Sequence, residues 1–269
     1  MSLIVENLRI DFGARTVVHE VSFEVSPGAR LGLIGESGSG KSLTALAILG
    51  LLPEGARASG SIRLDGEELL GRPDRELAGI RGDRIAMVFQ EPRTALNPLR
   101  RIERQIAEPA RLHGRLSKAQ TRARALELAE LVGLPEPAEI LRRYPHELSG
   151  GQRQRVSIAA ALSAGPRYLL ADEPTTALDV TVQSEILNTF DTLVRESGSG
   201  LVFITHDLAV LARIADHAVV LADGRVVESA PVRTLLEAPQ SELGRRLLAA
   251  ARRTAFRPAP ITREESTND

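Results

Sequence analysis

The amino-acid sequence predicts an α/β fold, in which buried strands alternate with helices. An apolar run at 31–34 leads into a glycine-rich segment at 35–42, and residues 42–52 then have the apolar spacing of a helix. The apolar side of that helix is predicted to contain Leu43, Leu46, Ala47 and Gly50. Two further apolar runs, at 168–171 and 201–205, each end in ionisable residues. Because open α/β sheets bind ligands at the carboxyl ends of their strands, we expect the three strand ends to share one site.

The glycine-rich segment fits the phosphate-binding pattern G-x-x-x-x-G-K-[ST] and lies between a strand and a helix, as that pattern requires. Free backbone N–H groups and the positive end of the helix dipole can surround phosphate oxygens. Lys41 supplies a point charge, and Ser42 can offer its hydroxyl to Mg²⁺. The alternative is a glycine-rich turn that only caps a helix. The candidate nucleotide-binding residues are Gly35, Glu36, Ser37, Gly38, Ser39, Gly40, Lys41 and Ser42.

Composition indicates an ordinary globular protein. The 269 residues suit one large α/β domain or a core with an inserted subdomain, with 43% hydrophobic and 26% charged residues. A net charge of −1 provides no basic field for DNA. No apolar run reaches the roughly 18 residues of a membrane-spanning helix. The absence of cysteine excludes disulfides and thiolate metal sites, and the N-terminus lacks a signal core, so we expect a cytoplasmic setting.

The N-terminal part is predicted to form an antiparallel β subdomain. Alternating strands over residues 3–25 are separated by a Gly-Ala-Arg turn. Further strands are expected at 60–64 and 84–89, in the same β region and its junction with the core. Phe12, in the first ribbon, could stack on a purine base, and an ordinary half-buried strand phenylalanine is the alternative.

A helix-patterned, arginine-rich block at about 101–143 interrupts the alternation of strands and helices. We therefore predict a domain over 1–253 with an inserted helical subdomain at about 92–164 and a C-terminal helical extension at about 231–253. Residues 254–269 are expected to form a mobile polar tail. The basic face of the block is either a solvated surface or a partner-facing one; its residues are Arg100, Arg101, Arg104, Arg111 and Arg115.

The sequence LSGGQ at 148–152 opens a helix. Its simpler interpretation is a capping box, because Ser149 and Gln152 have the S-x-x-Q spacing that satisfies free N–H donors at a helix start. The alternative is a second anion site, since Gly150 and Gly151 let the backbone approach a phosphate closely. One chain would then carry two phosphate-binding helix ends, which a single nucleotide cannot easily occupy in one monomer.

Two adjacent acids end the apolar strand at 168–171. Burying two carboxylates is costly unless they bind a positive charge, and the obvious candidate is Mg²⁺ bound to a nucleotide. Asp172 suits the metal, directly or through water. Glu173 points to the other face, because strand residues alternate, and can polarise an attacking water as general base. His206 ends the strand at 201–205, either as a structural residue or as part of the same ligand edge.

These segments together resemble the ATPase subunit of an ABC transporter in residue type, order and spacing. The resemblance covers residues 3 to about 230, and LSGGQ is its most specific element because it separates this family from other phosphate-loop NTPases. It implies a P-loop NTPase core that uses ATP and Mg²⁺. The segments that carry it are GESGSGKS, Gln90, LSGGQRQR, YLLADEP, the loop AlaLeuAsp at 177–179, and His206.

The resemblance implies a role for each matching residue. Gly35 to Ser42 would hold the phosphates, with Ser42, Gln90 and Asp172 at the metal. Gln90 would also face the membrane partner. Glu173 would be the base, and His206 would contact the γ-phosphate.

Other implied roles concern a second subunit. Ser149, Gly150, Gly151 and Gln152 would contact the γ-phosphate that the opposite subunit binds, and Asp179 would cross the dimer interface. Phe12 matches the adenine-stacking aromatic, which is commonly Tyr. The implied partners are a second identical or distinct ATPase subunit, two transmembrane permeases and an extracytoplasmic substrate-binding protein. The implied location is the cytoplasmic face of the membrane.

A finer resemblance is to importers of oligopeptides, dipeptides, nickel and metal-carrying opines, through VFQEPRTALNPL, YPHELSGGQRQR, ADEPTTALDVTVQ and FITHDLAVLARIAD. Members often end in His-Pro-Tyr-Thr followed by cysteines that can hold an iron–sulfur cluster. This chain has APQSELGRRLL at that position and no cysteine, which excludes the cluster and leaves the cargo open.

Two alternatives belong to other classes. A soluble ABC-type mechanical ATPase acting on nucleic acid or ribosomes shares the nucleotide motifs, but such chains usually carry a long coiled coil or a second cassette. A stand-alone phosphate-loop kinase or GTPase leaves LSGGQRQR unexplained, and the guanine-selecting N-K-x-D is absent. The sequence therefore favours transport.

Overall fold

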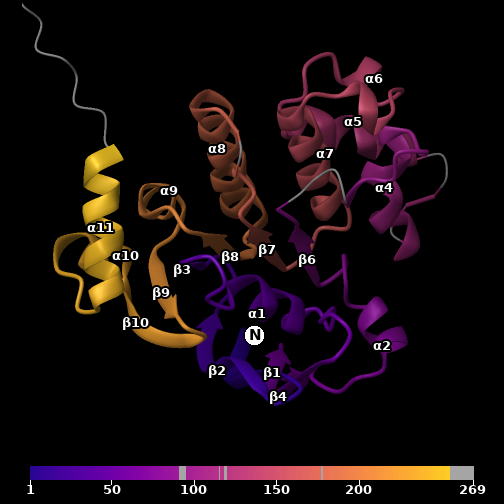
Figure 1. Ribbon diagram of the computed structural model, residues 1–269. Coiled ribbons are helices and arrows are strands. Elements are labelled where there is room, and N and C mark those ends of the chain that lie inside the picture. Colours follow the sequence, from indigo (N-terminus) through magenta and orange to yellow (C-terminus); the bar gives the residue numbers. More distant parts are fainter. Residues whose placement is uncertain (91–94, 115, 118–119, 177, 255–269) are drawn as a thin grey trace, which may run out of the picture.

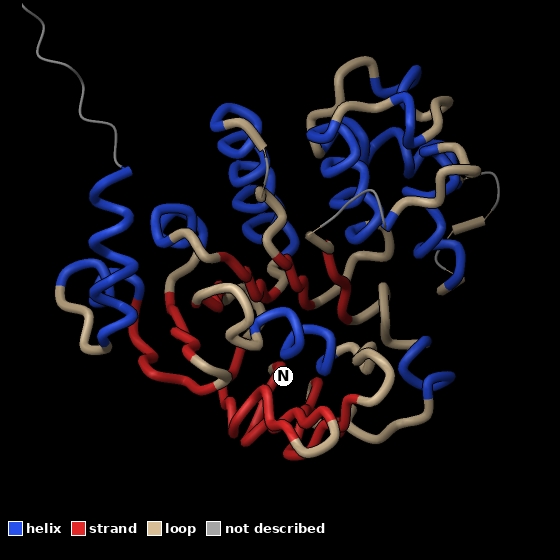
Figure 2. The backbone as a smooth tube through the Cα atoms, viewed as in Figure 1, coloured by secondary structure: helices blue, strands red, loops and turns tan. Residues whose placement is uncertain are grey.

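The computed structural model describes residues 1–90, 95–114, 116–117, 120–176 and 178–254. A six-stranded sheet lies between two other layers (Figures 1 and 2). On one side of it are the helix α1 and a four-stranded sheet, and on the other side are the remaining long helices. Each side has its own hydrophobic core, so the central sheet is buried on both faces.

The four-stranded sheet confirms the predicted antiparallel ribbon. Its order is β2-β1-β4-β5, and all its pairs are antiparallel. The expected strand at 60–64 is the end of a longer one. The bounds are Leu3–Phe12 for β1, Arg15–Val25 for β2, Ala56–Leu64 for β4 and Glu67–Glu68 for β5.

The central sheet has the order β10-β9-β3-β8-β7-β6, and its strands are parallel except for β10. The expected strand at 84–89 is β6, which forms the edge of this sheet rather than part of the N-terminal β region. Residues of β7 alternate between the two cores, with Leu169 on the helical side and Leu170 on the α1 side. The bounds are Arg30–Gly35 for β3, Ile85–Val88 for β6, Tyr168–Asp172 for β7, Gly200–Thr205 for β8, His217–Ala222 for β9 and Arg225–Pro231 for β10.

The helix after the glycine-rich segment is shorter than predicted, and it buries a different face. It is α1, Lys41–Ile48, and its buried residues include Thr44 and Ala45, whereas Leu43 and Leu46 are only half-buried. The predicted apolar side was therefore wrong in part. The physical reason is that α1 contacts β3 and β7 and also packs into the hydrophobic core on its own side of the central sheet. Its buried positions are therefore not confined to one stripe.

Helices from α4 to α7 occupy the region where an inserted helical subdomain is expected. Helices α4, α5 and α7 pack on one another through buried residues such as Ile106, Leu128 and Val156. The exact limits, 92–164, stay a prediction. The bounds are Ile102–Leu112 for α4, Thr121–Leu131 for α5, Pro137–Ile140 for α6 and Gly150–Leu162 for α7, with a 3₁₀ turn at Pro145–Glu147 and a short α2 at Asp74–Ala78.

The arginines of this block are partly engaged within it. Arg100 forms an ion pair with Glu108 at 2.5 Å, and Arg101 lies over the ring of Tyr144. Arg104 and Arg111 are exposed. Arg115 lies outside the described residues, as do Ala177 and the tail 255–269.

The remaining helices complete the layer opposite α1. The expected helices near the C-terminus are confirmed as α10 and α11, which follow the edge strand β10 (Figure 1). Helix α11 packs beside β9 and α9. The bounds are Val180–Ser197 for α8, Leu208–Ile214 for α9, Val232–Glu237 for α10 and Glu242–Thr254 for α11.

Replacing Phe190 with alanine should lower the free energy of unfolding by about 3–5 kcal/mol, because it empties a fully buried site. Phe190 is 0% exposed and meets Phe203 edge-to-face with ring centroids 5.6 Å apart. Denaturant unfolding measures the change. Val180→Ala on the same helix is the control, since Val180 is 81% exposed. An equal effect of the two substitutions would contradict this core assignment.

Candidate functional site

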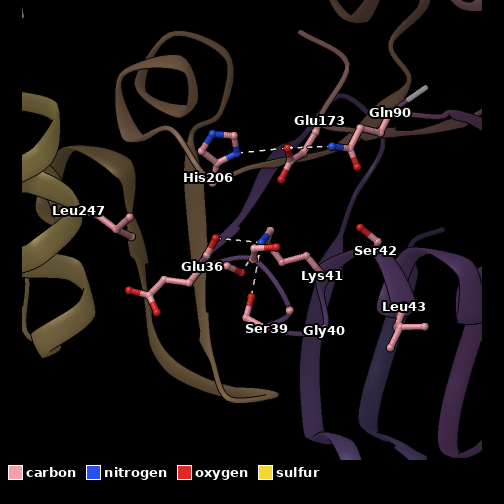
Figure 3. A pocket seen from close by; sticks show the side chains of 13 residues that line it. Glu36, Ser39, Gly40, Lys41, Ser42, Leu43, Gln90, Glu173, His206 and Leu247 are labelled. Carbon is pink, nitrogen blue, oxygen red and sulfur yellow. Dashed lines mark hydrogen bonds and ion pairs between the residues drawn. The ribbon is translucent and has the colours of Figure 1, made fainter. Parts of the chain in front are cut away.

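The segment 35–42, called the phosphate loop below, connects β3 to α1. It lines one side of a pocket of 540 Å³ (Figure 3). Gly40 is the residue before α1, with φ of +96°, and a Cβ there would lie 2.8 Å from Val18 Cγ2. Only glycine fits this combination of backbone conformation and close approach. The pocket is lined by Gly35, Glu36, Ser37, Gly38, Ser39, Gly40, Lys41, Ser42, Leu43, Gln90, Glu173, His206 and Leu247.

The ammonium group of Lys41 lies inside this loop. Its Nζ donates to the backbone oxygens of Gly35 and Glu36, each at 2.8 Å. The side chain is buried, and burial lowers the pKa of Lys41 despite the opposing attraction of Glu173 and Asp172. A polyanion in the pocket would stabilise the charged form. The loop therefore presents a desolvated cation to a ligand with several negative charges.

Beside Lys41, a hydroxyl and a carboxylate meet. Ser42 Oγ donates to Asp172 Oδ1 at 3.0 Å, which joins α1 to the end of β7. Burial raises the pKa of Asp172, and the hydrogen bond from Ser42 offsets part of that effect. A nearby cation would favour the ionised carboxylate.

Ser42 and Asp172 are two of the residues expected at the Mg²⁺ site. Within the described ranges, no group of three or more His, Cys, Asp or Glu side chains could hold a metal. Mg²⁺ does not need such a group, because it commonly takes one or two protein oxygens and completes its shell with phosphate oxygens and water. Ser42 and Asp172 are oxygen ligands of this kind beside the phosphate loop, so the residues present fit Mg²⁺ carried by a nucleotide.

Glu173 lies at the centre of a short row of polar side chains across the pocket (Figure 3). Its Oε2 is 3.4 Å from Gln90 Nε2 and 3.1 Å from His206 Nδ1, and it accepts a hydrogen bond from Thr176 Oγ1 at 2.9 Å. The ends of β3, β7 and β8 thus lie at one pocket, as predicted. Strand alternation is the wrong reason for the direction of Glu173, however. The residue follows the end of β7 with φ of +42°, so a turn, not the strand, directs its side chain.

Seven of the candidate residues lie outside the lining of this pocket; one of them, Asp172, is hydrogen-bonded to the lining residue Ser42. Phe12 is partly buried against the core on the α1 side. Ser149 and Gln152 form the predicted capping box, with Ser149 Oγ accepting from Gln152 N at 3.2 Å, and Ser149 and Gly150 are exposed at the start of α7. Asp179 caps α8 by accepting from Val182 N at 2.9 Å. The two helix ends therefore do not share one pocket within the chain.

Sequence reasoning missed one part of the pocket wall. Leu247 of α11 lines it beside His206, on the side opposite Gln90 (Figure 3). An apolar residue at helical spacing is an ordinary core signal, so nothing in the sequence marked Leu247 as a site residue.

The geometry joins a phosphate loop, a hydroxyl–carboxylate pair at a strand end and a separate LSGGQ helix start. Residues 18–176 match the family described as ABC transporter. The chain belongs to the ABC transporter family. Its fold agrees, because a dimeric ATP-binding cassette solved in a post-hydrolysis state with ADP and phosphate matches with a TM-score of 0.77 and 31% identity, over 87% of this chain and 99% of that one. The site is thus that of an ATP-hydrolysing ABC cassette.

Several curated proteins similar to this chain are named as transport ATP-binding proteins. The peptidoglycan transport ATP-binding protein YejF of Agrobacterium fabrum is 50% identical over 92% of this chain and 46% of its own length. The oligopeptide transport ATP-binding protein OppD of Salmonella typhimurium is 44% identical over 88% of this chain and 72% of its own length. The chain spans about half, or less, of several curated relatives that it matches. Across the described part of this ABC cassette, no helix is both long and apolar enough to span a bilayer.

Replacing Lys41 with alanine should weaken ATP binding itself, and turnover should fall with it, because the substitution deletes the cation of the phosphate loop. Titration with a fluorescent ATP analogue measures the affinity. Lys118, the only other lysine of the chain, provides the matched control as Lys118→Ala. Unchanged affinity in Lys41→Ala would contradict the role of the loop.

Proposed function

We propose that this chain is the ATP-binding, ATP-hydrolysing subunit that powers a membrane ABC importer, with peptides as the first candidate cargo. The observation that carries the proposal is the pocket lined by the phosphate loop and by Glu173, with Asp172 hydrogen-bonded to the loop residue Ser42. The names of the relatives support a transport role. We infer that the chain acts as a peripheral subunit at the cytoplasmic face of the membrane.

Within this proposal, different residues at the pocket bind the phosphates, hold the metal and accept the proton. Lys41 and the loop N–H groups bind the β- and γ-phosphates, and Ser42 with Asp172 would hold Mg²⁺, which neutralises phosphate charge when bound. Glu173 accepts a proton from the attacking water. Gln90 and His206 flank Glu173, which keeps its carboxylate over the pocket and close to the expected γ-phosphate.

Replacing Glu173 with glutamine should leave ATP binding intact and slow hydrolysis by about two to four decades, the usual size of a general-base contribution. The amide keeps the shape of the carboxylate and removes the base. Phosphate release and nucleotide titration measure the two effects. Glu196→Gln, at an exposed position on α8, is the control. More than half of the wild-type rate in Glu173→Gln would show that Glu173 is not the base.

The proposed partner at the nucleotide is a second ATPase subunit. The exposed capping box at Ser149 lies outside the pocket of its own chain. It uses the backbone N–H groups of Ser149 and Gln152, and it leaves those of Gly150 and Gly151 to an anion. Two chains arranged head to tail would bring the start of α7 of one over the phosphate loop of the other. ATP would then stabilise the dimer by linkage, and hydrolysis would release it. The dimeric state of the solved relative supports this arrangement.

An apolar groove supports a membrane partner. It has a volume of 640 Å³ and lies between the central sheet and the helical block, next to β6, which ends two residues before Gln90. Phe89 and Leu112 in its wall are 37% and 76% exposed. A short amphipathic helix of a permease would cover these side chains and contact the site through Gln90.

The cargo is the least constrained part of the proposal. The named relatives are described as peptidoglycan and oligopeptide transport ATP-binding proteins, so peptides come first. Nickel and metal-carrying opines rest on the finer sequence resemblance alone. In such a system an extracytoplasmic binding protein and two permeases would select the cargo. Transport of labelled peptide, nickel and opine by the reconstituted complex would distinguish the three.

A soluble mechanical ATPase acting on nucleic acid or ribosomes remains the second candidate, but no feature of the described residues favours it. Copurification with hydrophobic membrane subunits separates the two candidates.

In the complete complex, Ser149→Arg should abolish ATP-dependent closure, because a bulky side chain would block the phosphate-facing helix start. Gln90→Ala should reduce cargo transport more than hydrolysis, since it acts between the pocket and the groove. Paired transport and phosphate-release assays measure both. Glu130→Arg, at an exposed position on α5 of the same helical block, is the control for a new arginine. Full activity of an isolated monomer, with no effect of Ser149→Arg, would overturn the composite site.

A further inference from the structure

The start of helix α11 is held by a buried carboxylate of the edge strand β10. Glu228 is 8% exposed, and its Oε1 accepts from Gln240 N at 2.8 Å. Its Oε2 accepts from Ser241 N at 2.8 Å and from Ser241 Oγ at 2.6 Å. Burial acts to raise the pKa of Glu228, but these donors outweigh it, and the pKa lies below its usual value. The first turn of α11 is therefore fixed to the sheet.

This anchoring directs one face of α11 at the phosphate loop. Leu243 is buried and Leu247 lines the nucleotide pocket. Between them, Arg246 Nη2 lies 2.7 Å from Glu36 Oε1. Figure 3 shows the Glu36 side chain extending from the loop toward the helix that carries Leu247. A residue near the C-terminus thus contacts the second position of the phosphate loop.

The negative charge of Glu36 affects phosphate binding because Glu36 lies in the phosphate loop. It lies within the segment that must receive a multiply charged phosphate chain, and a carboxylate there repels that anion. Asp223 and Glu242 line an adjoining cavity of 370 Å³ together with Glu36, so further negative charge lies close by. Arg246 lines the same cavity and provides the opposing charge.

We propose that Arg246 is a positioning residue for the nucleotide: it holds the Glu36 carboxylate toward α11 and compensates its charge, which favours phosphate binding in the loop. Arg246 acts through Glu36 and need not touch the ligand. The inference rests on the proposal that this pocket takes ATP. Its expected size is modest, because the side chains of Arg246 and Glu36 are 65% and 56% exposed and exposed ion pairs are weak.

The test is a double-mutant cycle on the purified full chain with a fluorescent ATP analogue and ATP hydrolysis. Arg246→Ala should raise the Kd for the analogue and the KM for ATP by about two- to five-fold, the range that an exposed ion pair supports, with kcat changing less. Arg246→Lys should restore most of the affinity. At about 0.5 M salt the difference between Arg246→Ala and wild type should shrink, since exposed charges are screened.

The decisive variant is Arg246→Ala in a Glu36→Gln background. If Arg246 acts by compensating the carboxylate, its loss should cost less than about 1.5-fold once that carboxylate is gone. Arg252→Ala removes a charge at an exposed position later on the same helix and is the matched control. Thermal melting of every variant monitors folding.

Three results would overturn the inference. The first is an undiminished loss of affinity in the Glu36→Gln background, which would mean that Arg246 only supports the helix. The second is an equal effect of Arg252→Ala, and the third is no change in Kd on Arg246→Ala. If the wild-type chain itself fails to bind ATP, the proposed function fails, and that outcome is separate from all three.

Discussion

The parallel pairing of β3, β8 and β7 is the constraint on which the rest of the structure depends. Its register sets Ile34 opposite Thr205, and Asp172 opposite Ile204, so the three strands end at one level. The phosphate loop, the two acids and His206 follow those ends directly. Residues more than a hundred positions apart, such as Ser42 and Asp172, therefore lie within hydrogen-bond distance. Without that register the motifs would be present in the chain and no pocket would form.

Burial gives the site its electrostatic character. The Lys41 ammonium and the Asp172 carboxylate are both withdrawn from water, which lowers the pKa of the first and raises that of the second. Each charge is thus less stable at this position than in water. In the proposed function, a nucleotide carrying Mg²⁺ would supply an anion for Lys41 and a cation for Asp172. The same desolvation that costs stability makes the pocket selective for such a ligand.

The start of α7 lies apart from the phosphate loop of its own chain. The capping box at Ser149 belongs to α7, which packs against α4, α5 and β6, and it does not reach the pocket of its own chain. In the proposed dimer one nucleotide contacts both helix starts, and this separation is then the reason for dimerisation. The groove beside β6 is lined by residues of β6, α4 and α7.

The sequence by itself determined the strand, loop and helix of the phosphate site, the antiparallel β1 and β2, and the helices near the C-terminus. These depend on local signals, such as glycine spacing, alternating apolar residues and capping patterns, that a short stretch of chain contains in full. Only the tertiary structure decided which face α1 buries, because α1 packs between two sheets. It also decided the direction of Glu173, which a positive φ sets after the strand ends. The contact of α11 with Glu36 joins residues 210 positions apart, and no local pattern encodes it.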